Sequence, residues 1–149
     1  MQNPRYEEIF DFLKAVDTAF PVPLSEKQSL EALAHKFCEK ATVCYEKRQG
    51  KIVCLVAGYT KEITDNMAYI SVVATLPDVR GKGYAQRLVR QFLEICEGEN
   101  IAAVHLYTDK SNAAAIALYK KLGFVFYTAD NEPRPEDVHL IYYINGEKG

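Results

Sequence analysis

The hydrophobic period of the chain changes near Thr42, and this change limits the fold more than any other feature of the sequence. Upstream of Thr42, apolar residues recur with the period of about 3.6 residues that helices show. Downstream, runs rich in β-branched and aromatic residues alternate with further helical patterns. A chain that combines consecutive strands with later strand and helix alternation is typical of a mixed sheet covered by helices. The sequence therefore predicts an α/β fold.

Two helices are predicted before Thr42. The first has an apolar stripe made of Tyr6, Ile9, Phe10, Leu13 and Val16. We expect Asn3 to cap this helix and Pro4 to occupy its first turn, where proline is tolerated. The apolar face of the second helix lies within residues 30–38, and Ser25 with Gln28 reads as the capping box that opens it.

The downstream patterns predict six strands and two helices. We expect strands over residues 42–46, 52–60, 67–76, 102–107, 124–129 and 138–144, and helices over residues 83–97 and 112–122. Gln49 and Gly50 predict a tight hairpin, Asp65 and Asn66 a second turn, and Gly98 and Gly123 the ends of the two helices. The order is α-α-β-β-β-α-β-α-β-β. With 149 residues and no repeat or linker, residues 1–149 are expected to form one domain.

Composition narrows the class of protein. Apolar residues make up 48% and charged residues 26% of the chain, which is the balance of a globular protein. The net charge of −2 argues against a partner that is a nucleic acid or an anionic membrane. The longest apolar run, residues 52–58, is too short to span a bilayer. Cys38, Cys44, Cys54 and Cys96 all lie in apolar stretches, which favours reduced cysteines and a cytoplasmic location.

The most informative stretch for function is the basic, glycine-rich turn of residues 79–85, between a predicted strand and a predicted helix. The start of a helix offers unpaired N–H groups to an anion, and Gly81 and Gly83 let that anion approach the backbone. The turn is not a Walker A loop, because Lys82 is followed by Gly83 rather than by serine or threonine. It also lacks the third glycine of a dinucleotide fingerprint. A tight turn that carries solvated basic residues is the alternative interpretation.

Two motifs connect this turn to a known family. Arg80-x-x-Gly83-x-Ala85 resembles the acyl-CoA signature of the GNAT superfamily of N-acetyltransferases, and Asn112-x-x-Ala115-x-x-Leu118-Tyr119-x-x-x-Gly123-Phe124 is similar to the motif that follows it in that family. The motifs span residues 69–126. The resemblance implies a mostly antiparallel mixed sheet with helices on both faces, and acetyl-CoA as the co-substrate. We expect the family's first strand to be missing, because residues 1–5 are too few to form it.

The resemblance also implies roles for individual residues. It makes Tyr119 the acid that protonates the leaving thiolate, whereas the spacing alone would also fit a tyrosine of the core. The residues that it places against acetyl-CoA are Val73, Thr75, Arg80, Gly81, Lys82, Gly83, Tyr84, Ala85 and Asn112. Val73 and Thr75 would act through backbone groups of a bulged, splayed strand. Asn112 would contact the CoA arm or simply cap its helix.

The general base stays open. Some members of the family have a glutamate at the position of Tyr69, and a tyrosine is a poor base. His105 and His139 are candidates by chemistry, although a single histidine on a strand is more often structural. A water relay, or a substrate that is already partly deprotonated, is the alternative.

The acceptor is equally open, and an amino sugar, a polyamine, an amino acid and a peptide N-terminus all fit. Acidic side chains that would attract a cationic amine, or simply be solvated, are Asp17, Glu26, Asp130, Glu132, Glu136 and Asp137. The absence of a tail or a second domain favours a small-molecule amine.

Three functions are therefore compared. The leading one is an acetyl-CoA-dependent N-acetyltransferase, and the second is a non-catalytic acyl-CoA sensor or scaffold. The third, a nucleic-acid protein that uses the basic stripe of residues 80–90, conflicts with the net charge. No cluster has metal-ligand spacing, so no metal is expected. The sequence is compatible with a homodimer formed through a sheet edge or a helix.

Overall fold

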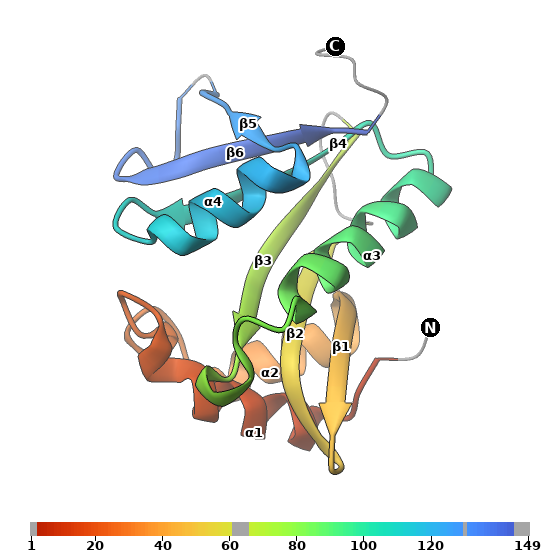
Figure 1. Ribbon diagram of the computed structural model, residues 1–149, viewed down its shortest axis with the longest axis vertical. Helices are drawn as coiled ribbons and strands as arrows, with labels where there is room; N and C mark the ends of the chain where they lie inside the picture. The colour runs from red at the N-terminus through yellow and green to blue at the C-terminus, as the bar shows by residue number, and fades with distance from the viewer. Residues whose placement is uncertain (1–2, 61–65, 130, 145–149) are drawn as a thin grey trace.

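The computed structural model describes residues 3–60, 66–129 and 131–144. Its centre is a six-stranded sheet in the order β1-β2-β3-β4-β6-β5 (Figure 1). The strands are β1 (Thr42–Arg48), β2 (Lys51–Tyr59), β3 (Met67–Thr75), β4 (Ala103–Asp109), β5 (Val125–Phe126) and β6 (Asp137–Tyr143). Only β3 and β4 pair in parallel. The expected mixed, mostly antiparallel sheet is confirmed.

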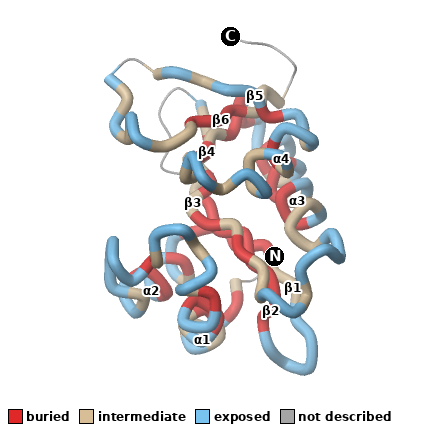
Figure 2. Tube along the Cα trace, turned by 60° about the vertical axis from the view of Figure 1, so that its left-hand side comes forward, coloured by how far each residue is buried: buried red, intermediate tan, exposed pale blue. Residues whose placement is uncertain are grey.

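Helices cover both faces of this sheet. On one face lie α1 (Tyr6–Val16) and α2 (Leu30–Lys40), and on the other lie α3 (Tyr84–Gly98) and α4 (Ala113–Leu122). Three short 3-10 turns, η1 (Asp17–Ala19), η2 (Leu24–Glu26) and η3 (Pro77–Val79), interrupt the connections. Each pair of helices has its own apolar core against the sheet, and Figure 2 shows the buried residues along the strands and the inner sides of the helices.

A bulge and a splay in the middle of the sheet determine where a site can form. The register between β2 and β3 shifts so that Ala57 faces Val72 and Gly58 faces Ile70, which leaves Ser71 as the extra residue of a β-bulge. β3 pairs with β4 only over residues 67–70, although both strands continue beyond this point. The two strands therefore separate at their carboxyl ends and leave a gap in the sheet.

The helix starts differ from the predicted caps. α1 is capped at Arg5, not at Asn3. The Asn3 amide instead donates to carbonyls at the end of α2, the shortest bond being 2.7 Å to Ala41 O. α2 opens at Ser29, whose Oγ accepts from Ala32 N at 3.1 Å, so the capping box at Ser25 was wrong. Ser25 is held by Asp17, which accepts from both its N–H and its hydroxyl.

Several predicted ends are also corrected. Gly98 was predicted to end the helix, but α3 includes Gly98. The residue with a positive φ after the helix is Asn100, at 61°. The strand expected over residues 124–129 is only two residues long, because the chain then turns toward Glu132, which accepts a bond from Ala129 N. Asn66 has the positive φ of a turn residue, whereas Asp65 lies outside the described residues.

The cysteines behave as apolar core residues. All four are free, and Cys44, Cys54 and Cys96 are buried in the core beneath α3. Burial raises the pKa of the Cys44 thiol to about 11, so this thiol is protonated and unreactive at neutral pH. Across the described ranges, no helix has the length and apolarity needed to cross a membrane.

Candidate functional site

A cavity of about 470 Å³ occupies the gap where β3 leaves β4. The glycine-rich turn and the first turn of α3 form one wall, and α4 forms another. The predicted residues that line it are Val73, Thr75, Arg80, Gly81, Gly83, Tyr84, Ala85, Asn112 and Tyr119. Lys82 is exposed and is not among the lining residues. Residues predicted from two separate motifs thus meet at one cavity.

The glycine-rich turn needs its glycines for their backbone conformation. Gly81 and Gly83 both have φ of 81°, in the left-handed region that other residues rarely adopt. A Cβ at either position would meet only open space, so the constraint is conformational rather than steric. Gly83 is the N-cap of α3, and no side chain among the described residues caps this helix. The first N–H groups of α3 are therefore left for an anion in the cavity.

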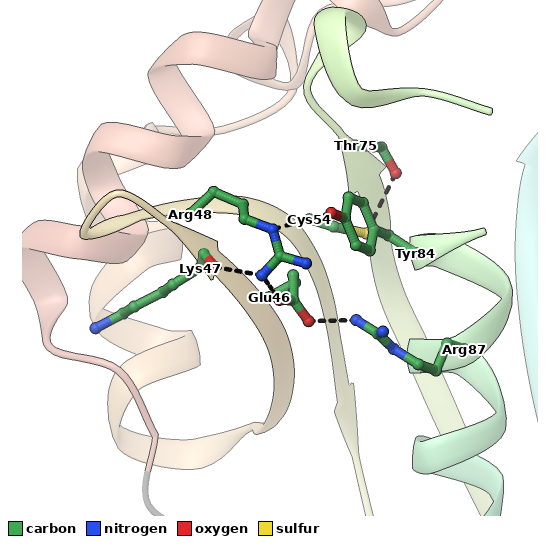
Figure 3. A network of polar contacts seen from close by, with 7 residues as sticks. All are labelled: Glu46, Lys47, Arg48, Cys54, Thr75, Tyr84 and Arg87. Atoms are coloured by element: carbon green, nitrogen blue, oxygen red, sulfur yellow. Dashed lines mark hydrogen bonds and ion pairs between the residues drawn. The ribbon is translucent and has the colours of Figure 1, made fainter. Parts of the chain in front are cut away.

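A polar network anchors this turn to the β1–β2 hairpin (Figure 3). The carboxylate of Glu46 pairs with both Arg48 and Arg87. Arg48 Nε also donates to the Tyr84 hydroxyl at 3.1 Å. The two guanidinium groups lie 5.2 and 5.3 Å from the centre of the Tyr84 ring. Tyr84, the first residue of α3, is thereby held in place, and sequence reasoning missed this support because Arg48 is 36 residues away from Tyr84 in the sequence.

Backbone groups of β3 point into the gap. Leu76 N donates to Val53 O of β2 at 2.9 Å. Because backbone bonds alternate in direction along a strand, the N–H and C=O groups of Val73 and Thr75 face away from β2. Arg80 Nε donates to Thr75 O at 3.4 Å from that open side. The structure thus has the bulged, splayed strand that the family resemblance implied.

Tyr119 and Asn112 reach the cavity from α4. The Tyr119 side chain is buried, and burial raises the pKa of its hydroxyl, which is therefore protonated at neutral pH. Asn112 is the N-cap of α4, and its Oδ1 accepts from Ala115 N at 3.2 Å. The capping interpretation of Asn112 is thus observed, and Asn112 is also one of the residues that line the cavity.

The two histidine candidates for the base lie side by side on β4 and β6. His105 Nδ1 is 2.8 Å from His139 Nε2, and His139 Nδ1 is 2.9 Å from Glu132 Oε2. Burial and the neighbouring His139 lower the pKa of His105 to about 4. Hydrogen bonds from Tyr107 and His139 lower the pKa of Glu132 to about 2. Neither histidine is a lining residue of this cavity, so no base is assigned.

The acidic side chains do not form a single attracting surface. Asp17 is occupied by Ser25, and Glu132 is turned inward by Tyr107 and His139. Asp137 pairs with Arg134 at 2.6 Å, while Glu26 and Glu136 are exposed. Asp130 lies outside the described residues.

Comparisons with known sequences agree on one protein family. The sequence profile described as the acetyltransferase (GNAT) family matches residues 8–124, a range that includes Arg80–Ala85 of the first motif and Asn112–Phe124 of the second. The mycothiol acetyltransferase of Streptomyces coelicolor is 33% identical over 114 residues, which are 76% of this chain and 36% of that protein. That of Brachybacterium faecium is 43% identical over 61 residues, which are 41% of this chain and 18% of that protein. The chain thus spans about a third or less of these relatives.

Solved structures share the fold. An acetyltransferase of the GNAT family from Staphylococcus aureus superimposes with a TM-score of 0.77 over 97% of both chains, at 15% sequence identity. The PaiA N-acetyltransferase from Thermoplasma acidophilum, solved in complex with coenzyme A, gives a TM-score of 0.74 at 16% identity over 93% of this chain and 92% of that one. At such identities the likeness shows the fold alone.

Proposed function

Because the chain belongs to the acetyltransferase (GNAT) family, we propose that it transfers the acetyl group of acetyl-CoA to a primary amine of a small molecule. One observation carries the proposal. A single cavity joins an uncapped helix start, outward-facing backbone groups of β3 and a buried, protonated tyrosine. These are an anion site, an oxyanion site and a proton donor, which acyl transfer from a thioester requires.

The donor half of the reaction would use the turn and β3. The pyrophosphate of acetyl-CoA would bind the N–H groups at the start of α3, with Arg80 and Lys82 adding positive charge. The pantetheine arm would run along the gap beside Val73 and Thr75. A backbone N–H of this segment would then stabilise the negative charge that develops on the thioester oxygen.

The chemical step follows from this placement. The neutral amine attacks the thioester carbon, a C–N bond forms, and the C–S bond breaks as the tetrahedral intermediate collapses. Tyr119 gives its hydroxyl proton to the departing sulfur, because a thiolate left in a buried cavity is costly. The proton lost by the attacking amine leaves to water and, through exchange with solvent, restores the tyrosine. No covalent enzyme intermediate is needed.

The proposal of a small-molecule acceptor is supported by the names of the relatives, which are mycothiol acetyltransferases. This chain matches only part of those proteins, so the identity of its amine does not follow from theirs.

Calorimetric titration with acetyl-CoA tests the donor site, with Gly83→Asp as the blocked variant. An aspartate at φ of 81° strains the turn and places a carboxylate where the pyrophosphate would bind. We expect micromolar binding that the variant loses, followed by thiol release when an acceptor amine is added. Absence of binding at millimolar acetyl-CoA would contradict the proposal. Binding without turnover across an amine panel would favour an acyl-CoA sensor.

A further inference from the structure

A second, smaller chamber adjoins the cavity and differs from it in chemistry. It has a volume of about 120 Å³ and shares Tyr119, Asn112 and Val73 with the first cavity. We call it the polar chamber, and its further charged and polar lining residues are Lys27, Ser71, Tyr107, Thr108, Asp109, Arg134 and Asp137. Since Tyr119 borders both spaces, a molecule in the polar chamber lies next to the proposed reacting sulfur.

Two carboxylates face each other at one end of this chamber. Asp109 of β4 and Asp137 of β6 are direct cross-strand partners, so their side chains lie on the same face of the sheet. Like charges in this arrangement destabilise a sheet. A fold that keeps such a pair at the edge of a cavity provides a place where an ammonium group is favoured.

Cations from other segments balance these carboxylates. Arg134 Nη2 is 2.6 Å from Asp137 Oδ2. Asp109 Oδ1 accepts hydrogen bonds from the N–H and the hydroxyl of Ser111 at 2.8 and 2.6 Å, and Lys27 of the segment before α2 acts electrostatically on the same carboxylate. The charged residues that line the chamber are therefore two acids and two bases. Such a lining gives no net attraction for a polycation, whereas a zwitterion can satisfy both signs of charge.

Neighbouring side chains position the Arg134 guanidinium so that it can bind an anionic group. The guanidinium lies 4.9 Å from the centre of the Tyr107 ring and interacts electrostatically with the Tyr69 hydroxyl. Tyr107 is fixed in turn by its 2.6 Å hydrogen bond to Glu132. A guanidinium has five N–H donors in a planar fork, more than Asp137 uses. The remaining donors suit a carboxylate, which this fork binds through two oxygens.

We propose that the acceptor is an amine that also carries a carboxylate, as an amino acid does, and that Arg134 determines this specificity by binding the carboxylate. This inference rests on the proposed function. Glu132 is a positioning residue, because it holds Tyr107 beneath the guanidinium and ties the loop that carries Arg134 to His139.

The test compares L-amino acids with their primary amides as acceptors, using thiol release from acetyl-CoA. The amide loses its ammonium proton more readily, so a preference for the acid cannot come from amine reactivity. We expect kcat/KM for the best amino acid to exceed that for its amide about tenfold or more. Arg134→Gln should bring this ratio close to one, and Arg134→Lys should keep part of it. Arg90→Gln, on the exposed side of α3, is the matched control and should keep the full ratio.

The ratio is independent of how much enzyme is folded, so a merely structural effect of Arg134 would not change it. An equal rate with acid and amide, or a preference for a diamine, would overturn the inference and leave the acetyltransferase proposal standing. An unchanged ratio in Arg134→Gln would overturn the role of Arg134. No acetylation of any amine, despite acetyl-CoA binding, would overturn the proposed function and this inference with it.

Discussion

At the scale of single residues, the hydroxyl of Tyr119 is the group on which the proposed chemistry depends most. Tyr119→Phe removes the proton donor but keeps the ring that packs 5.6 Å from Phe124. We therefore expect kcat to fall about 100-fold or more, while the Kd for acetyl-CoA stays unchanged. Steady-state kinetics and calorimetry measure the two quantities. Tyr45→Phe on β1, away from both cavities, serves as the control, and an unaltered kcat in Tyr119→Phe would remove this residue from the mechanism.

Asn112 has two functions that substitution can separate. Asn112→Ala loses the cap of α4 and should cost about 1 kcal/mol of stability. Asn112→Ser keeps an oxygen that caps the helix but loses the side-chain amide. If the amide contacts acetyl-CoA, the serine variant should keep its Tm while KM for acetyl-CoA rises several-fold. A normal KM in the serine variant would leave Asn112 with a capping role only.

At the scale of secondary structure elements, the bulge in β3 depends on Gly58 of β2. A Cβ at Gly58 would lie 2.5 Å from Phe92 Cζ on α3 and 2.7 Å from Tyr69 O. Gly58→Ala should therefore lower the free energy of unfolding by about 1–3 kcal/mol, as overpacked core positions do. Gly98→Ala, at the end of α3 with open space around it, should be neutral or stabilising. Urea denaturation measures both, and equal stability of the two variants would contradict this account of the bulge.

The element order was predictable because periodicity is a local signal, whereas several ends were not. The α-α-β-β-β-α-β-α-β-β order is confirmed, as is the placement of helices on both faces of the sheet. Ser25 and Ser29 lie one helical turn apart, and only the contact of Ser25 with Asp17 decides which of them caps α2. Asn3 fails as a cap because its amide binds carbonyls at the far end of α2, 34 or more residues away.

At the scale of the whole molecule, the two halves of the site differ in how far the sequence reveals them. The family assignment from the motifs is confirmed. The sequence pointed to the cavity wall formed by the turn of residues 80–85 because that turn is contiguous and has a physical signature, and its binding of acetyl-CoA stays a prediction. The polar chamber shares Asn112 and Tyr119 with the second motif, but its charged lining comes from residues 20–27, from β4 and β6 and from the loop before β6, which lie outside both motifs. Arg134 reaches Tyr107 only through strand pairing, so sequence reasoning did not identify it.

The contact of His105, His139 and Glu132 links β4 and β6 to the loop between β5 and β6, and it makes the stability of the fold depend on pH. Burial and the neighbouring His139 lower the pKa of His105 to about 4, below its ordinary value of 6.5. Between these values the unfolded chain binds a proton that the folded chain does not, so stability falls as the pH falls from 6.5 toward 4. Glu132 adds a second loss at lower pH, because its lowered pKa of about 2 favours the ionised form in the folded state.

We expect the free energy of unfolding of the wild-type chain to drop between pH 7 and pH 4.5, with about 1–2 kcal/mol of the drop due to His105. This amount allows for screening by solvent, because the ring is partly exposed. His105→Gln should remove that part of the pH dependence, since glutamine has no proton to gain and can still donate to His139. His35→Gln, at an exposed ring on α2 that stacks on Tyr6, should retain the wild-type dependence. Urea denaturation at both pH values measures the slopes, and a slope in His105→Gln as steep as that of the wild type would show that the proton enters elsewhere.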